Sequence, residues 1–307
     1  MATDTPTPVP EPTSPPRPRV LRQLAELLDM IKFEHTVFAL PFAFLGAVGA
    51  AQGWPAWDKV FWILGAMVGA RTAAMTFNRL VDADIDADNP RTASRALPAG
   101  RVGRNGAMVL LGAAAALFGF AAGMLGPLPL KLAPLALAVI LGYSLCKRFT
   151  SWSHLVLGLS LAGAPLGAWI AVSGRFELPA LLLSLGVLSW TAGFDIIYSL
   201  QDEEFDRRAG LHSIPARLGS AGALWVSRLL HAGALAAWAA YNLGQGSLLF
   251  PWLGWTAVAA ILVREQWIVR DGDLARVDVA FFTLNSQVGL IFLAGHVAER
   301  LFMVQAA

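Results

Sequence analysis

Three oxygen-bearing side chains recur at every fourth position early in the chain: Asn78, Asp82 and Asp86. In an α-helix this spacing puts all three on one face, each one turn from the next. Aligned carboxylates repel each other, and the repulsion grows where water is excluded, so we expect the stripe to hold a cation. Hard oxygen ligands suit Mg²⁺, which usually completes its coordination with phosphate oxygens of a substrate. Asp84 and Asp88 point away from this face, and we expect them to be solvated or paired with arginine.

A second acidic stripe follows later in the chain, where four side chains lie close to one helical face by the same count: Asp195, Tyr198, Asp202 and Asp206. A single run of charge is usually a solvated loop. The repetition of the spacing at the end of another apolar segment makes that interpretation improbable. Two such stripes that face each other would hold metal ions around one diphosphate group.

Positive and phenolic side chains accompany the acidic stripes. Arg91 and Arg95 follow the first stripe, and Tyr143 and Lys147 stand at the end of an apolar segment between the two. We regard these groups as candidates for binding diphosphate oxygens. Basic residues at such positions also orient membrane proteins, and that role needs no chemistry.

Arg71 differs from the other arginines because it interrupts an otherwise apolar segment. It stands two helical turns before Asn78 on the same face. An arginine within a membrane is costly enough to be a functional candidate, and the alternative is a structural pair with another helix.

The sequence contains few other groups that suggest chemistry. The histidines show no metal-ligand spacing and no Ser/His/Asp order, and no glycine-rich phosphate loop is evident, so we assign them no catalytic role. The single cysteine, Cys146, has no partner for an intramolecular disulfide. The five histidines are His35, His154, His212, His231 and His296.

The elements that position these side chains are predicted to be membrane helices. The 307 residues are 56% hydrophobic and 14% charged, with a mean hydropathy of +0.57, whereas a soluble domain carries roughly a quarter charged residues. The apolar residues come in runs of about twenty, the length that spans roughly 30 Å of hydrocarbon. We therefore expect an all-α integral membrane bundle of about nine transmembrane helices in the lipid bilayer. Their approximate windows are 33–52, 57–78, 105–125, 131–146, 154–173, 178–198, 218–241, 247–265 and 278–298.

The ends and the connections predict the domain organisation and the orientation. Residues 1–19 have the proline content of a disordered tail, which leaves residues 20–307 as the transmembrane domain. Basic residues crowd into alternate connections, so the positive-inside rule places the N-terminus and both acidic stripes in the cytoplasm, with a bacterial-type inner membrane as the expected location. The odd number of spans then puts the C-terminus outside. The net charge of +2 is too small to suggest a nucleic-acid partner.

At these residues the chain resembles the UbiA family of membrane prenyltransferases. The first motif of that family, Asn-x-x-x-Asp-x-x-x-Asp, is matched by Asn78, Asp82 and Asp86, and its second aspartate-rich motif by Asp202 and Asp206. The resemblance covers nearly the whole chain after the tail, and the sequences around both motifs are most similar to the 4-hydroxybenzoate polyprenyltransferase branch. The other candidates also stand at family-like offsets: Arg71, Arg91, Arg95, Tyr143, Lys147, Asp195 and Tyr198.

This resemblance implies Mg²⁺-dependent transfer of a polyprenyl group from polyprenyl diphosphate to an aromatic acid acceptor in the biosynthesis of a quinone such as ubiquinone. It implies that the arginines after the first stripe and Lys147 hold the diphosphate, and that Asp195 or Tyr198 steers the allylic cation or removes the ring proton. Arg71, which lies deeper than the stripe, is expected to bind the carboxylate of the acceptor. The implied metal ligands are Asp82, Asp86, Asp202 and Asp206.

The sequence leaves two questions open: the identity of the acceptor, and the choice between an enzyme and a transporter. The acceptor is either an acid of the 4-hydroxybenzoate type or a dihydroxynaphthoate-type acid of a menaquinone pathway. A divalent-cation transporter would also bury charge, but it should show related halves and helices interrupted at the midplane, whereas these acids cluster at helix ends. We therefore favour an enzyme over a transporter.

Overall fold

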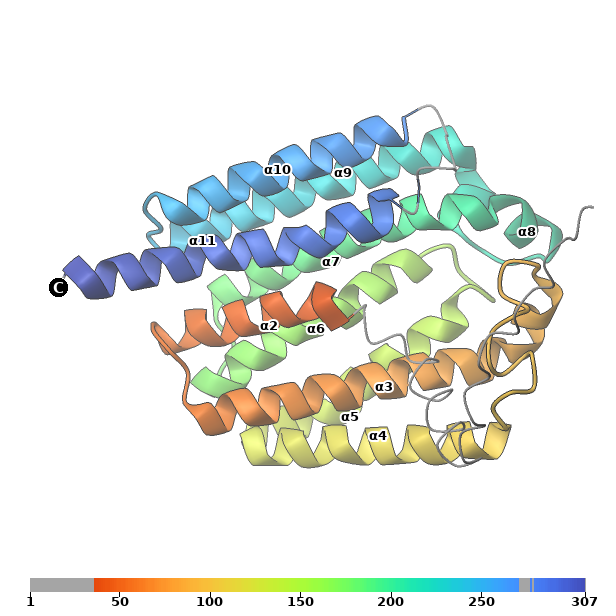
Figure 1. The fold of residues 1–307 in the computed structure, drawn as a ribbon, viewed down its shortest axis with the longest axis horizontal. Coiled ribbons are helices and arrows are strands. Elements are labelled where there is room, and N and C mark those ends of the chain that lie inside the picture. The colour runs from red at the N-terminus through yellow and green to blue at the C-terminus, as the bar shows by residue number, and fades with distance from the viewer. Residues whose placement is uncertain (1–35, 271–276, 278, 307) are drawn as a thin grey trace, which may run out of the picture.

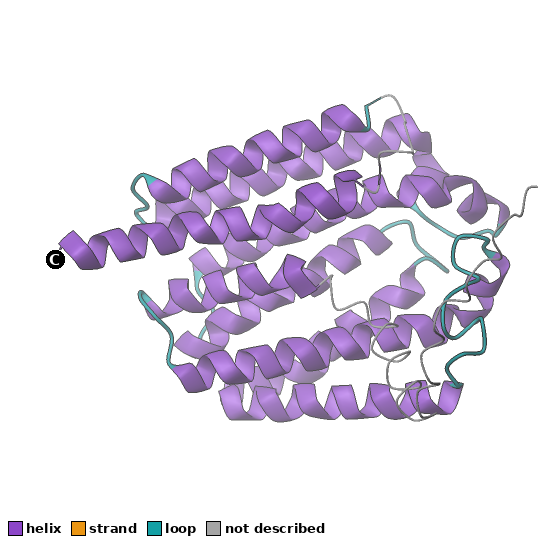
Figure 2. Ribbon diagram, viewed as in Figure 1, coloured by secondary structure: helices purple, strands orange, loops and turns teal. Residues whose placement is uncertain are grey.

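The computed structural model describes residues 36–270, 277 and 279–306, so the expected N-terminal tail lies outside the described residues. Within these ranges the chain forms nine long helices and contains no strand, which confirms the predicted all-α class (Figure 2). Three short elements stand between them: η2 (Leu200–Asp202), α8 (Glu203–Arg208) and the π-helical η4 (Val279–Leu284). The long helices are α2 (Thr36–Ala51), α3 (Trp57–Asp88), α4 (Arg104–Leu125), α5 (Pro127–Cys146), α6 (Ser153–Ser173), α7 (Leu178–Ser199), α9 (Ile214–Gly244), α10 (Phe250–Ile268) and α11 (Asn285–Ala306).

The helices run up and down along one common direction (Figure 1). Successive helices pack against each other, most extensively α3 with α4, α6 with α7, and α7 with α9. The chain order is broken where α2 packs against α6 and α11 packs against α2, which brings the first described helix and the last into the same layer. The C-terminal end of α11 lies at the end of the bundle opposite to α8 (Figure 1).

Five helical segments of the described chain are long and apolar enough to cross a membrane, and the apolar part of α2 is shorter. The last predicted window, 278–298, is displaced from α11, which runs from Asn285 to Ala306. At α3 the window ends at 78 but the helix continues to Asp88. The window followed the apolar residues, whereas the last turns of α3 are acidic, and three of their carboxylates pair with cations from other segments. The five segments are Trp57–Asp88, Arg104–Leu125, Pro127–Cys146, Ser153–Ser173 and Leu178–Arg208.

Small residues let the helices approach closely, as the alanine- and glycine-rich sequence predicts. A Cβ atom on Gly46 of α2 would lie 2.4 Å from the carbonyl oxygen of Pro165 in α6. A Cβ atom on Gly158 of α6 would lie 2.4 Å from the carbonyl oxygen of Leu188 in α7. The backbone of α6 is therefore held against both neighbours, which fixes the helices that carry the candidate site.

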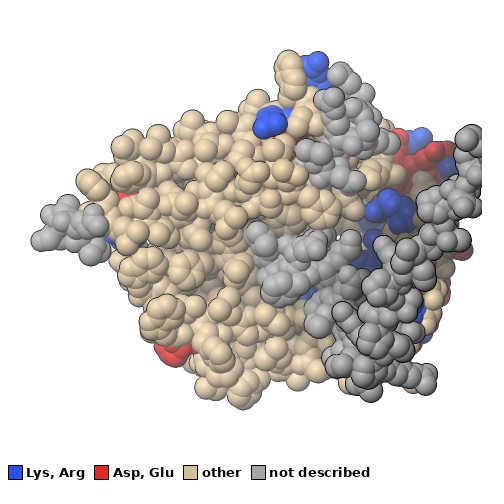
Figure 3. All heavy atoms as spheres, in the orientation of Figure 1, with Lys and Arg blue, Asp and Glu red and all other residues tan. Residues whose placement is uncertain are grey.

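Charged side chains gather at one end of the bundle, around α8, while the visible flank is almost entirely uncharged (Figure 3). The connections from α3 to α4 and from α5 to α6, and the segment after α7, all lie at that end (Figure 1). The distribution agrees with a bundle whose apolar flank faces lipid and whose charged end faces water.

Candidate active site

The connection that follows the first acidic stripe binds the second stripe directly. Asn89 donates a hydrogen bond from Nδ2 to Asp202 Oδ1 at 3.4 Å. Arg91 donates from Nε to Asp202 Oδ1 at 3.0 Å and from Nη2 to Asp202 Oδ2, a bidentate pair. The same guanidinium donates from Nη1 to the hydroxyl of Tyr198 at 3.0 Å. These contacts join the end of α3 to the end of α7 and assemble a single site from the two stripes.

The first stripe lies on one continuous helix, as its spacing predicts. Asn78 donates from Nδ2 to Asp82 Oδ2 at 2.9 Å, so the first two members of the stripe are in contact. Asp86 is buried and accepts from Arg95 Nη1 at 2.7 Å on both carboxylate oxygens. Asp84 points away and pairs with the exposed Arg104 at 2.7 Å, which confirms the expectation for this residue.

The second stripe is not one helical face, and the count that placed its four residues together is wrong in this respect. The α-helix ends at Ser199 and the chain continues through the 3₁₀ turn of η2 before α8 begins. Asp202 and Asp206 are nevertheless both buried at the charged end. The change from α-helical to 3₁₀ geometry at η2 therefore sets the orientation of these two carboxylates, rather than the period of one continuous α-helix.

Lys147 lies where the two stripes meet. Its Nζ is 3.8 Å from Asp206 Oδ2. Burial alone would lower the pKa of the Lys147 ammonium. The negative charges around it have the larger combined effect, so the pKa of Lys147 is raised above its usual value. These charges come from both stripes and belong, in decreasing order, to Asp206, Asp202, Asp195 and Asp82.

The pKa of the Arg91 guanidinium shifts in the same direction. Burial opposes its charge, but the hydrogen bond and the charge of Asp202 raise its pKa. Both Arg91 and Lys147 therefore stay positively charged at neutral pH, which suits them to an anionic substrate.

The acidic side chains fit a divalent cation that a substrate helps to bind. Asp206 Oδ2 is buried and accepts no hydrogen bond from the described residues, so one carboxylate oxygen is available as a ligand. Among the described residues, no three His, Cys, Asp or Glu side chains are close enough together to hold a metal ion by themselves. Mg²⁺ in phosphate-transferring sites is usually held by one or two carboxylates together with substrate phosphates and water. The arrangement thus agrees with Mg²⁺ that enters together with a diphosphate.

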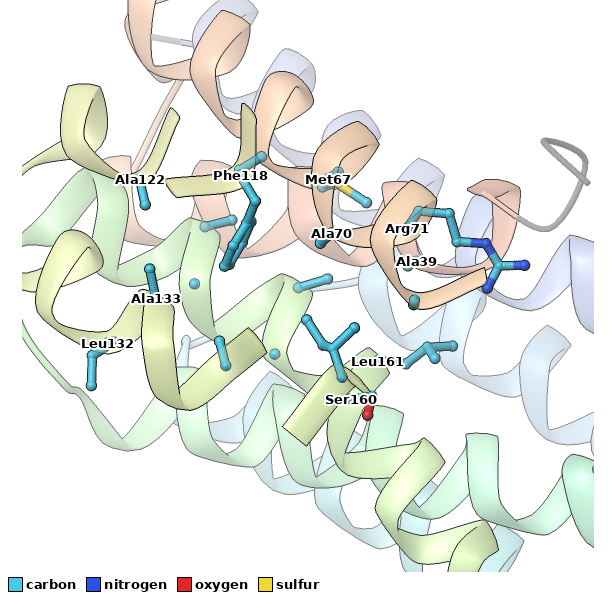
Figure 4. Close-up of a pocket in the computed structure, with 18 of the residues that line it drawn as sticks. Ala39, Met67, Ala70, Arg71, Phe118, Ala122, Leu132, Ala133, Ser160 and Leu161 are labelled. Atoms are coloured by element: carbon cyan, nitrogen blue, oxygen red, sulfur yellow. The ribbon is translucent and has the colours of Figure 1, made fainter. Parts of the chain in front are cut away.

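An apolar cavity extends from the candidate site between α3, α4, α5 and α6. About 1220 Å³ there is free of protein atoms, and part of this space is open to the outside. Arg71 lies toward one end of this cavity and Phe118 and Ala122 toward the other (Figure 4). Apart from Arg71, Tyr143 and Ser160, the lining residues are apolar or glycine.

Arg71 has no protein partner for two of its nitrogens within the described structure. Its Nε and Nη2 are buried and donate no hydrogen bond. Tyr143 lines the same cavity, and the charged groups that act on it include Arg71, Arg79 and Asp195. A buried guanidinium with unsatisfied donors is costly, so this end of the cavity suits an anionic group of a ligand.

The structure adds two residues that the sequence did not single out, His154 and Arg79, and it also gives the contacts of Arg148, which the sequence places beside Lys147 as a further cation for the diphosphate. His154 is buried, with Nδ1 2.7 Å from Asp195 Oδ2. Arg79 is buried, with Nη1 4.0 Å from Asp86 Oδ2. Arg148 donates from Nη2 to the carbonyl oxygen of Val81 at 2.7 Å. Arg79 adjoins the candidate Asn78 in the sequence, which was an available signal, whereas nothing along the chain links His154 to Asp195.

Comparison with known proteins identifies similar sequences. The sequence model of the UbiA prenyltransferase family matches residues 39–287. The chain is 33% identical over 239 residues to the mitochondrial 4-hydroxybenzoate polyprenyltransferase of Drosophila pseudoobscura pseudoobscura, covering 75% of this chain but only 58% of that relative. It is 31% identical over 300 residues to the 4-hydroxybenzoate octaprenyltransferase of Paracidovorax citrulli, covering 93% of this chain and 97% of that relative.

Solved structures with the same fold are also found. The apo structure of a UbiA homolog from Aeropyrum pernix K1 is 36% identical and superposes with a TM-score of 0.80, covering 87% of this chain and 98% of that one. A UbiA homolog from Archaeoglobus fulgidus bound to DMAPP and Mg²⁺ is 19% identical, with a TM-score of 0.70 over 90% of this chain and 99% of that one. The second likeness shows the fold alone.

Proposed function

The chain belongs to the UbiA prenyltransferase family, and from this premise we propose that it transfers a polyprenyl group from polyprenyl diphosphate to 4-hydroxybenzoate or a similar aromatic acid in quinone biosynthesis. One observation carries the proposal. Arg91, in the connection after the first stripe, pairs with Asp202 of the second, Lys147 lies beside Asp206, and two other candidates, Arg71 and Tyr143, line an apolar cavity. The polar end suits a diphosphate, and the apolar cavity suits its hydrocarbon chain.

The comparisons support the choice of acceptor and donor. The relatives quoted above carry the name of 4-hydroxybenzoate prenyltransferases, which favours this acceptor over a dihydroxynaphthoate acid. The structure from Archaeoglobus fulgidus holds DMAPP and Mg²⁺ in the same fold. The match to a prenyltransferase family also does not favour a cation transporter.

We propose that the diphosphate binds to the basic side chains that are paired with the acidic side chains in this structure. Arg91, Arg95 and Lys147 each lie within 4.0 Å of a buried or partly buried carboxylate. A diphosphate at this end of the bundle would accept hydrogen bonds from these donors. Bound Mg²⁺, held by Asp82, Asp86, Asp202 and Asp206, would neutralise the charge of the leaving group.

The transfer then replaces one bond by another. The allylic C–O bond of the donor breaks and the diphosphate leaves with the electron pair. A ring carbon next to the phenol of the acceptor forms the new C–C bond, and the ring proton passes to a base. Asp195 is our choice for the base, because the hydroxyl of Tyr198 already accepts a hydrogen bond from Arg91; Tyr198 is better placed to steer the cation. The apolar lining of the cavity would keep water away from the cation, which water would otherwise trap.

The reaction itself tests the proposal. Membranes that contain the full chain are incubated with a polyprenyl diphosphate, Mg²⁺ and a panel of aromatic acids, and products are identified by mass spectrometry. We expect a prenylated 4-hydroxybenzoate and no product when the acid is replaced by the corresponding phenol. Absence of a product with every aromatic acid in the panel would contradict the proposed function.

Replacing a glycine that lines the cavity by a larger residue should change the preference of the enzyme for the chain length of the prenyl donor. Gly163 lines the cavity, and a Cβ atom added there meets no atom of the described residues within 4 Å, so a larger side chain at this position extends into the empty space. We expect Gly163→Phe to lower kcat/KM for a long polyprenyl diphosphate on the order of tenfold relative to geranyl diphosphate.

Gly112→Phe is the matched control for this change. Gly112 also has open space around its added Cβ atom, but it is exposed on α4 and does not line the cavity. An equal loss with short and long donors in Gly163→Phe would show that the cavity does not bind the prenyl chain.

We further propose that both acidic stripes face the cytoplasm, in an inner membrane of the bacterial type. The basic connections support this orientation, since they lie at the same end of the bundle as the stripes (Figure 3). Reporter fusions after Pro90 and after Gly210, which are both exposed, should report a cytoplasmic location. An external location for either fusion would reverse the proposed topology.

A further inference from the structure

His154 joins three segments that lie far apart in the sequence. Its side chain has no exposed surface. Nδ1 lies 2.7 Å from Asp195 Oδ2 on α7, and Nε2 lies 3.4 Å from the backbone nitrogen of Ile214 at the start of α9. A backbone N–H can only donate, so Nε2 is the acceptor in that contact. The proton of the neutral ring is therefore on Nδ1, and His154 donates it to Asp195.

This contact anchors one side of the Asp195 carboxylate. The Asp195 side chain keeps 21% of its surface exposed, whereas His154 has none. The charge of Asp195 acts electrostatically on Lys147 and on Tyr143, which are both candidates for the site. Asp195 thus has one oxygen fixed by His154, keeps part of its side chain exposed, and is close enough to Lys147 and Tyr143 for its charge to act on them.

The other side of the imidazole holds the segment that follows the second stripe. Ile214 donates to His154, and the preceding His212 donates from its backbone nitrogen to the carbonyl oxygen of Lys147 at 2.7 Å. Leu211 donates in the same way to the carbonyl oxygen of Asp206 at 2.8 Å. One buried ring therefore couples the orientation of Asp195 to the backbone around the acidic stripe.

We propose that His154 is a positioning residue that holds Asp195 for removal of the ring proton, an inference that rests on the function proposed above. His154 does not exchange a proton with the acceptor, because both of its nitrogens are engaged with the protein. It acts by restricting the carboxylate to one orientation. Partners that orient a reacting side chain in this way typically change activity by about 10- to 100-fold when they are removed.

Two amide substitutions separate the two contacts. In His154→Asn the amide nitrogen takes the position of Nδ1 and still donates to Asp195, but the acceptor for Ile214 is lost. In His154→Gln the amide oxygen reaches the position of Nε2 and still accepts from Ile214, but the donor for Asp195 is lost. We expect His154→Gln to lower kcat about tenfold with an unchanged KM for polyprenyl diphosphate, and His154→Asn to retain most of kcat.

The opposite pattern would overturn the proposal. A purely structural histidine would lower the thermal stability and kcat of both variants together. Full activity of His154→Gln, or a loss in His154→Asn as large as in His154→Gln, contradicts the positioning role.

A second measurement does not depend on turnover. Full-length protein with ¹⁵N-labelled histidine in detergent micelles should show a ring protonated on Nδ1 whose Nδ1 signal moves in Asp195→Ala. A ring protonated on Nε2, or a signal that Asp195→Ala leaves unchanged, would overturn the assignment. If no acceptor is prenylated by the unchanged protein, the proposed function fails, and this spectrum still decides whether His154 holds Asp195.

Discussion

Replacing Asp82 or Asp202 by alanine is expected to lower prenyl transfer at least about 10²-fold, the scale on which one electrostatic contact in a preorganised site acts. Each change removes a carboxylate that we assign to the binding of Mg²⁺ and so weakens the stabilisation of the leaving diphosphate. The fold should survive both changes, because the arginines that pair with Asp202 and Asp82 are partly exposed and can be solvated: Arg91 has 32% and Arg148 has 42% of its side chain exposed. Turnover is measured in membranes and thermal stability in detergent.

Two acidic neighbours provide matched controls. Asp84 and Glu204 have 88% and 84% of their side chains exposed and pair with exposed arginines. Such surface pairs contribute about 0–1 kcal/mol, so Asp84→Ala and Glu204→Ala should keep normal turnover. Near-normal turnover of Asp82→Ala or Asp202→Ala, or full activity in excess chelator, would exclude the metal-dependent mechanism.

Replacing Arg71 is expected to weaken the binding of the aromatic acceptor more than the binding of the prenyl donor. Two of its guanidinium nitrogens are buried without a hydrogen-bond partner among the described residues, and Arg71 lines the cavity together with Tyr143. A hydrogen bond to a charged group contributes about 1.5–3 kcal/mol, which corresponds to roughly a 10- to 150-fold change in affinity. We therefore expect Arg71→Ala to raise the KM of the aromatic acid about 10- to 100-fold. Lysine lacks the bidentate fork, so Arg71→Lys should behave similarly.

Arg104→Lys serves as the control, since Arg104 has 60% of its side chain exposed and pairs only weakly through Asp84. The assay determines KM for the acceptor and for polyprenyl diphosphate separately. If the KM of the acceptor stays constant in both Arg71 variants, or if phenols without a carboxylate react equally well, Arg71 has a structural role and the acceptor is not recognised by its acid group.

The sequence alone determined the properties that depend on local spacing. The length of the apolar runs predicted the membrane helices, since a span requires about twenty apolar residues wherever it lies in the fold. The spacing of four residues predicted that Asn78, Asp82 and Asp86 share one helical face, and the helix that carries them is continuous. The exposure of Asp84 follows from the same period. The positions of the two motifs were also sufficient to recognise the family.

Tertiary structure decided how these local elements meet. The pairing of Arg91 with Asp202, the place of Lys147 between the stripes and the hydrogen bond from His154 to Asp195 all join segments distant in the chain. The open cavity beside Arg71 likewise depends on how four helices pack. The turn at η2 shows the limit of periodicity, because a 3₁₀ segment changes the direction of every side chain after it. Local spacing fixes which face of a helix a residue occupies, but only the packing of helices fixes which faces come together.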